Sequence, residues 1–277
     1  MFSWIGSAFS RKPDNEDGPR TRYGWVRDLP DFRDHHKTFQ EFSGTPSVDL
    51  RQKCPDVYDQ GPLGSCTANA IAGAYEFDMM AQEEKAIFTP SRLFIYYNER
   101  AMEGTIPTDS GAQIRDGIKS IGKQGVVPES EWPYDISTFT TEPSPALYTE
   151  AKNHTAVKYS RVAQDIKHIK QALAEGHPIV FGFSVYESFE SEEVAKTGIM
   201  PMPEKSEQLL GGHAVMAVGY DDEQGRVIVR NSWGDSWGDK GYFYMPYEFI
   251  SDSGMTSDFW IVQKVIDQDL SSSEIND

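Results

Sequence analysis

The chain is predicted to be an α+β protein with a mainly helical first half and a mainly antiparallel β second half. Apolar residues recur at helical spacing from about residue 66 to 123, whereas strand-like segments dominate after residue 179. The 277 residues, 38% of them hydrophobic, suffice for two modest lobes with cores of their own. A helical half followed by a β half indicates two lobes, and a cleft between lobes is a usual place for a substrate.

Three helices are predicted in the first half. The first begins at Cys66, directly after a turn rich in glycine, and continues to about residue 80. The second covers residues 89–100, where a threonine followed by a proline resembles an N-cap with proline at the first helical position. The third covers residues 112–123 and ends before a glycine that suits a C-cap.

The second half is predicted to contain one short helix, residues 166–175, followed by five strands. The strand segments are rich in β-branched and aromatic residues. They are Ile179–Val185, His213–Tyr220, Arg226–Arg230, Tyr242–Met245 and Phe259–Val265. A turn at residues 221–225 joins two of them, which favours antiparallel pairing.

The charge of the chain excludes some classes of partner. With 26 Lys and Arg against 43 Asp and Glu, the formal net charge is −17. Because like charges repel, neither nucleic acid nor an anionic membrane surface is expected as a partner. No run of 18 apolar residues occurs, so no transmembrane helix is predicted. The sequence does not predict the oligomeric state.

Cys66 is the strongest candidate for a catalytic residue. The turn from Gln60 to Ser65 delivers it to the first turn of a helix, where free backbone N–H groups and the helix dipole favour a thiolate. A lone cysteine is more often a small buried apolar residue. Here, however, His213 and Asn231 follow well over a hundred residues later, which is the order of one known cysteine-nucleophile arrangement.

Three motifs make the sequence resemble the papain-like cysteine peptidases. They are Q-G-x-x-G-S-C ending at Cys66, H-A-V-x-A-V-G-Y from His213, and N-S-W-G-x-x-W-G-x-x-G-Y from Asn231. The resemblance extends from about Val48 to Val262. It implies a two-lobed fold with a helical N-terminal lobe, a β-barrel-like C-terminal lobe and an active site in the cleft between them.

The resemblance implies a role for each catalytic position. Cys66 would be the nucleophile, His213 its base, Asn231 the residue that orients the imidazole, and Gln60 a donor to the oxyanion. Trp233 would shield the contact between the asparagine and the histidine. The thiol and the imidazole would form a thiolate–imidazolium pair at rest. No metal and no organic cofactor is expected.

The resemblance also implies substrate-binding positions. Ser110 and Gly111 would present backbone to an extended substrate, and the glycine permits a close approach. Gly212 would line the cleft beside the base, and Trp237 would form the wall on the leaving-group side. Asp258 would lie near the main side-chain pocket, where it would favour a basic side chain.

Three functions remain open, and the one that we favour is an endopeptidase acting on peptides or proteins. A trimming exopeptidase would need a loop that blocks one end of the cleft. In the carboxydipeptidase branch of the family this loop carries a histidine, and no histidine occurs between Cys66 and His154. A catalytically silent peptide-binding homologue is disfavoured because all four catalytic positions are intact.

Only two cysteines occur, Cys54 and Cys66. Leu63 stands where the family commonly has a bridging cysteine, and Thr67 replaces the usual aromatic residue after the nucleophile. We therefore expect two free thiols. The absence of a disulfide framework, together with the lack of a basic start and a continuous apolar segment at the N-terminus, predicts an intracellular protein.

The predicted domain is residues 45–266, with a helical lobe at about 60–130 and a β lobe at about 155–266. Residues 1–44 form an N-terminal extension, and residues 267–277 form an acidic tail. Residues 10–21 are predicted to be linker.

The extension is expected to dock on the domain, because its large apolar side chains would be costly to leave in water. They are Tyr23, Trp25, Val26, Leu29 and Phe32. It would dock either in the cleft, which would make the protein a zymogen, or on the back of the lobes as a strap. We favour the cleft.

Overall fold

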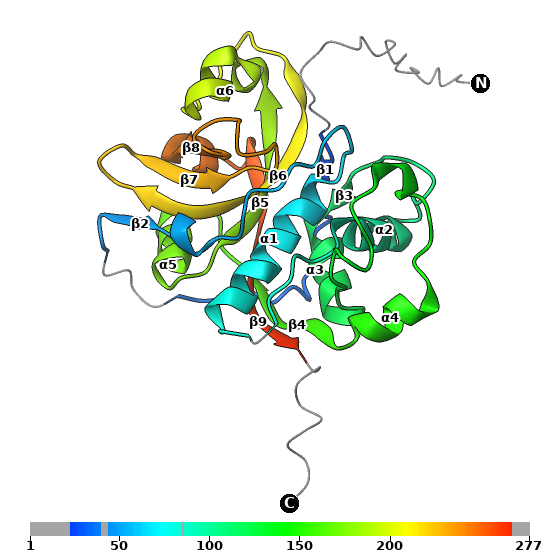
Figure 1. The fold of residues 1–277 in the computed structure, drawn as a ribbon. Coiled ribbons are helices and arrows are strands. Elements are labelled where there is room, and N and C mark those ends of the chain that lie inside the picture. The colour runs from blue at the N-terminus through cyan, green and yellow to red at the C-terminus, as the bar shows by residue number, and fades with distance from the viewer. Residues whose placement is uncertain (1–22, 40–43, 85, 268–277) are drawn as a thin grey trace, which may run out of the picture.

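The protein is described by a computed structural model in which residues 23–39, 44–84 and 86–267 are placed. Seven α-helices lie within these residues: α1 (Cys66–Ala81), α2 (Arg92–Glu103), α3 (Ile114–Lys123), α4 (Pro145–Ala151), α5 (Ile166–Ala174), α6 (Glu192–Thr197) and α7 (Tyr247–Ser251). Figure 1 shows α1 at the centre, α2, α3 and α4 to one side of it, and most of the sheet to the other. The fold is therefore the predicted α+β arrangement of a helical lobe and a β lobe.

The β lobe is built on one antiparallel sheet whose strands differ in length. Its strands are β2 (Ser47–Asp49), β4 (His154–Arg161), β5 (Ile179–Tyr186), β6 (Leu209–Asp221), β7 (Arg226–Arg230), β8 (Tyr242–Pro246) and β9 (Thr256–Asp267). They follow the order β4-β9-β5-β6-β7-β8, and β2 pairs with β6. Two further short strands, β1 (Trp25–Val26) and β3 (Ala112–Gln113), pair parallel to each other.

The predicted barrel-like lobe is not a closed barrel. Within the residues that the structure describes, β4 and β8 lie at opposite ends of the strand order and do not pair with each other. Instead of curling toward β8, the β4 edge lies against α3: a Cβ added at Gly122 would come within 2.8 Å of the Tyr159 ring. One edge of the sheet therefore ends beneath the helical lobe.

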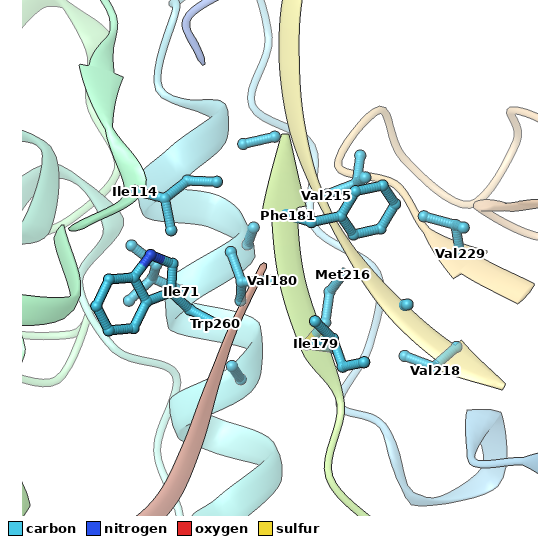
Figure 2. Packing of buried hydrophobic residues seen from close by; sticks show 14 of the residues in the cluster. Ile71, Ile114, Ile179, Val180, Phe181, Val215, Met216, Val218, Val229 and Trp260 are labelled. Atoms are coloured by element: carbon cyan, nitrogen blue, oxygen red, sulfur yellow. The ribbon is translucent and has the colours of Figure 1, made fainter. Parts of the chain in front are cut away.

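The core joins the two lobes through α1. Ile71 of α1, Val180 of β5 and Trp260 of β9 are all buried and lie close together in Figure 2. Phe181 and Val229 are buried on the other side of β5 in the same view. Because alternate residues of β5 point to opposite faces, this strand packs against α1 on one face and supports the β lobe on the other. The N-terminal end of α1 is consequently held rigidly.

Several elements were not predicted from the sequence, among them α4, α6, α7 and β2. Ala112 and Gln113, predicted as the start of a helix, form β3 because they pair with Trp25 and Val26. The strand β4 was not predicted at all, although it runs antiparallel beside β9. The predicted linker at residues 10–21 and the tail from residue 268 onward lie outside the described residues.

Candidate active site

The turn before α1 is fixed by hydrogen bonds to the helical lobe. The backbone N–H of Gly64 donates to Oδ1 of Asp109 at 3.0 Å, and the Tyr96 hydroxyl donates to the same oxygen at 2.6 Å. Asn69, one turn into the helix, donates to the backbone oxygen of Ser65 at 2.9 Å. These contacts position Cys66 as the first residue of α1, with 0% of its surface exposed.

His213 and Asn231 are supplied by the β lobe. His213 lies within β6, and Asn231 directly follows β7, the neighbouring strand. His213 Nε2 and Asn231 Oδ1 are 2.8 Å apart. The Trp233 ring stacks on the imidazole with centroids 4.9 Å apart and planes at 24°, which is the place predicted for a shielding residue.

The thiol and the imidazole are close but not hydrogen-bonded in this state. The backbone N–H of Ala214, the residue after His213, donates to Sγ of Cys66 at 3.4 Å. Nδ1 of His213 is buried without a hydrogen-bond partner among the described residues. The fold therefore brings the two predicted groups together, while their direct contact is not made.

Burial makes this pair neutral. It raises the pKa of Cys66 to about 12, although backbone N–H groups of Ala214 and Gly24 oppose the shift. Burial also lowers the pKa of His213 to about 4, against the hydrogen bond that its ring donates to Asn231 Oδ1. Both shifts disfavour charge. The described state thus favours a thiol beside a neutral imidazole rather than the thiolate–imidazolium pair expected from the sequence.

Gln60 is fully buried beside these groups. Its Nε2 donates to the backbone oxygen of Leu63 at 2.9 Å, and its Oε1 accepts a hydrogen bond from the Ser232 hydroxyl at 2.7 Å. Its backbone N–H donates to the Ser232 oxygen at 2.9 Å. Gln60 therefore links the turn before Cys66 to the residue that follows Asn231.

The N-terminal segment (residues 23–36) crosses directly over the nucleophile. The backbone N–H of Gly24 is directed at Sγ of Cys66 and lowers its pKa. The Gly24 oxygen accepts a hydrogen bond from the Ala112 N–H at 2.7 Å. A Cβ added at Gly24 would lie 1.9 Å from the Gly64 oxygen, so only glycine fits so close to the backbone there. The cleft is consequently filled by the chain itself.

Trp25 fills a pocket at the predicted substrate-binding residues. Its Nε1 donates to Oδ2 of Asp258 at 3.0 Å. A Cβ added at Gly182 would lie 1.9 Å from the indole ring, and one at Gly212 would lie 2.6 Å from the Trp25 oxygen. Asp258 and Gly212 thus both contact Trp25, an aromatic side chain that donates a hydrogen bond.

The remaining predicted substrate-binding residues are Gly111, Ser110 and Trp237. Gly111 has φ +71°, and a Cβ there would lie 2.1 Å from the Gly24 oxygen. Ser110 is exposed, and its hydroxyl donates to Thr105 Oγ1 at 2.9 Å. Trp237 packs edge-on against Trp233 with centroids 5.2 Å apart. All of these residues except Ser110 contact either the segment or the catalytic cluster.

The described residues contain no disulfide. Cys54 and Cys66 are both free thiols. No group of three or more His, Cys, Asp or Glu side chains among the described residues is arranged to hold a metal ion. No described helix is both long enough and apolar enough to cross a membrane.

Comparison with known proteins identifies the family. The family model described as papain family cysteine protease matches residues 45–262. The chain belongs to this family. It is 47% identical over 282 residues to an uncharacterized peptidase C1-like protein of Acanthamoeba polyphaga mimivirus, covering 92% of this chain and 91% of that protein.

The solved structures agree. Xylellain, a cysteine protease from Xylella fastidiosa, is 44% identical, with a TM-score of 0.81 over 91% of this chain and 99% of that one. By sequence, pro-cathepsin H of Bos taurus is 29% identical over 212 residues, which cover 72% of this chain and 58% of that protein. The papain-like fold is thus shared with xylellain.

Sequence reasoning missed several residues that shape the site. The turn containing Asp109 was noted, but not its bonds to Gly64 and Tyr96. Asp28, Asp34, Arg115 and Arg161 were not singled out, although they hold the segment in place. One local signal existed: a glycine inside a predicted strand, Gly182, often marks a close approach.

Proposed function

We propose that the protein is a cysteine endopeptidase that acts through Cys66, His213 and Asn231 and is latent in the state described here. The observation that carries the proposal is the convergence of Cys66 at the start of α1 with the hydrogen-bonded pair of His213 and Asn231 from the β lobe. His213 would take the thiol proton and later give it to the leaving amine. Asn231 would hold the ring, and Trp233 would keep water from their contact.

The oxyanion would be stabilised by the Cys66 backbone N–H and the Gln60 side chain. Gln60 is buried and tied to both lobes, so its orientation is fixed before a substrate binds. Preorganised donors of this kind contribute roughly 2.7–4 kcal/mol each to the transition state.

The segment would block this chemistry without becoming a substrate. At Cys66 it presents the N–H of Gly24, while the Gly24 carbonyl accepts a hydrogen bond from Ala112 on the helical lobe. A thiolate attacks a carbonyl whose oxygen lies at the oxyanion donors, whereas the Gly24 oxygen is bonded to Ala112 instead. The segment would therefore exclude water and substrate and survive in place.

The endopeptidase reading rests on the absence of a histidine between Cys66 and His154. An exopeptidase or a silent peptide-binding homologue remains the alternative. Cleavage of end-blocked peptides at rates comparable to free-ended ones would favour the endopeptidase, and a requirement for a free end would favour the exopeptidase.

The first experiment is titration of the full chain with a thiol-directed peptidyl reagent, with Cys66→Ala as control. We expect one equivalent to be consumed at Cys66, slowly in the native chain, and peptide hydrolysis to be lost in Cys66→Ala while the fold is kept. Peptide cleavage by Cys66→Ala at the native rate would refute the mechanism.

A further inference from the structure

A pair of arginines outside the catalytic cluster is bound to two carboxylates of the segment. Arg115, the second residue of α3, donates through Nη2 to Asp34 Oδ2 at 2.6 Å and through Nε to Asp34 Oδ1 at 3.0 Å. Its Nη1 donates to the backbone oxygen of Leu29. Its side chain is only 6% exposed. The hydrogen bonds of this guanidinium thus all end on the segment, within the described residues.

Arg161, from β4, binds the same two carboxylates. Its Nη2 donates to Asp28 Oδ2 at 2.6 Å, and its Nε donates to Asp34 Oδ2 at 2.8 Å. Its guanidinium lies 4.7 Å from the centre of the Trp260 ring. Planar contacts of an arginine with carboxylates and an aromatic face are typical of sites that recognise carboxylates specifically.

The buried Asp28 carboxylate is surrounded by hydrogen-bond donors. Its side chain is 0% exposed. Besides Arg161 it accepts hydrogen bonds from Trp260 Nε1 at 2.9 Å and from the backbone N–H of Arg115 at 3.0 Å. The N-cap residue of α3, Gln113, makes no capping hydrogen bond of its own. Asp28 therefore accepts a hydrogen bond from the backbone N–H of the second helical residue, which the N-cap side chain does not reach.

Removal of the segment would leave Arg115 and Arg161 without the carboxylates of Asp28 and Asp34. The described partners of the two arginines would then be reduced to Asp258, whose Oδ1 is 3.7 Å from Arg161 Nη1. A carboxylate ligand would regain charge-assisted hydrogen bonds with both guanidiniums, so it is favoured there. The charge of the two arginines is the reverse of that of the chain as a whole, whose net charge is −17.

We propose that Arg115, Arg161 and Trp260 form a carboxylate-binding recess, separate from the nucleophile, whose ligand is a peptide carrying two carboxylates six residues apart. Its occupant in the full chain is residues 28–34. The recess, rather than the cleft contact alone, decides whether the segment stays bound. This inference deepens the proposed latency and rests on it for its effect on activity, but the binding itself can be measured separately.

The test uses the full chain carrying Asp28→Asn and Asp34→Asn, whose own segment binds the recess less well. A fluorescently labelled synthetic peptide of residues 23–36 is titrated against it, in three forms: native, Asp28→Asn with Asp34→Asn, and Asp31→Asn. Asp31 is the control, because its short ion pair is with Arg33 of the same segment, at 2.7 Å, while it reaches the domain only through Lys119 Nζ at 3.5 Å.

We expect the native and Asp31→Asn peptides to bind alike and the doubly substituted peptide to bind at least about tenfold more weakly. Equal binding of all three peptides overturns the recess. If the doubly substituted chain does not fold, the Gly24→Val chain is used in its place. The segment of that chain competes equally with all three peptides, so the ratios of their affinities are unchanged.

Inhibition of peptide hydrolysis by the same peptides is measured in parallel. Inhibition that follows the binding order supports both the recess and the latency. Binding with the expected order but without inhibition supports the recess and refutes the proposed latency, so the two failures are distinguishable.

Discussion

The two halves of the N-terminal segment are held by different forces. Residues 23–26 lie in the cleft through backbone contacts and one buried indole, with Gly24 packed against the Gly64 backbone. Residues 28–34 are held by charge, with Asp28 and Asp34 almost fully buried against two arginines. The first half blocks the nucleophile, while the second half holds the segment there. Different residues of the segment thus occupy the cleft and provide the affinity for the domain in the proposed mechanism.

The difference also corrects the reason given for docking. Burial of large apolar side chains predicts that Leu29 and Phe32 are covered, yet they are 70% and 99% exposed. Val26 is 45% exposed, whereas Trp25 is buried. The segment docks as expected, but Tyr23, Trp25 and two carboxylates make the contacts. The number of large apolar side chains therefore predicted that the segment docks, but it did not predict which residues make the contacts.

The largest expected effect comes from displacing the cleft half. Gly24→Val places a side chain where even a Cβ would lie 1.9 Å from the Gly64 oxygen. The segment must leave the nucleophile, so we expect peptide hydrolysis by the full chain to rise about tenfold or more, which corresponds to about 1.4 kcal/mol or more. Steady-state assays with a small neutral peptide measure it. Val26→Thr, at an exposed position beside it, is the control, and an unchanged rate in Gly24→Val would contradict cleft blockage.

The ionisation of the thiol should change with the same substitution. In the described state burial raises the pKa of Cys66 to about 12 and lowers that of His213 to about 4, so thiolate becomes scarcer with each unit that the pH falls below 12. We expect the alkylation rate of the native chain to keep rising with pH between about 7 and 10. In Gly24→Val, exposure permits the ion pair, and the rate should level off near neutral pH. Profiles of identical shape would show that the segment does not control ionisation.

A smaller effect is expected in the charged half. Asp34→Asn removes hydrogen bonds to both arginines but leaves Asp28, so we expect hydrolysis by the full chain to rise roughly threefold to tenfold. Asp31→Asn should change the rate much less, because Asp31 pairs mainly with Arg33 of the same segment and reaches the domain only through Lys119 at 3.5 Å. The same small-peptide assay measures both. Equal rises in the two variants would mean that general charge, and not the recess, holds the segment.

The smallest effect on hydrolysis is expected for a buried carboxyl that lacks the partners of Asp28 and Asp34, because its ionisation changes stability. Asp78 in α1 is buried, its Oδ2 has no hydrogen-bond partner among the described residues, and burial raises its pKa from 3.8 to about 8. Because the folded state binds this proton more tightly, the contribution to stability is complete below about pH 4 and is lost as the pH rises through 8.

Asparagine cannot ionise, so the stability of Asp78→Asn relative to the native chain should improve between pH 5 and pH 8. We expect a gain of about 3–4 kcal/mol, seen as a higher thermal midpoint. Thermal unfolding at the two pH values measures it. A gain that is the same at pH 5 and pH 8 would mean that Asp78 does not titrate in this range.

The sequence alone determined much of this protein, because the relevant information is local. The turn, the helix start and the three motifs identify Cys66, His213, Asn231 and Gln60 and lead to the family. Apolar spacing gave α1, α2 and most of α3, since helical periodicity is visible within a dozen residues. The absence of bridging cysteines likewise predicts the free thiols that the structure has. The intracellular location stays a prediction.

Only the tertiary structure decided how the segment is held and in which protonation state the site rests. Arg161 lies 127 and 133 residues from the two aspartates that it binds, and no pattern along the chain links positions so far apart. Whether the sheet closes depends on where β4 packs, and β4 has no clear signal of its own. The neutral state of Cys66 and His213 follows from burial by a segment that is distant in sequence. Spacing along the chain reveals which residues can react, whereas desolvation and charge pairing depend on what finally surrounds them.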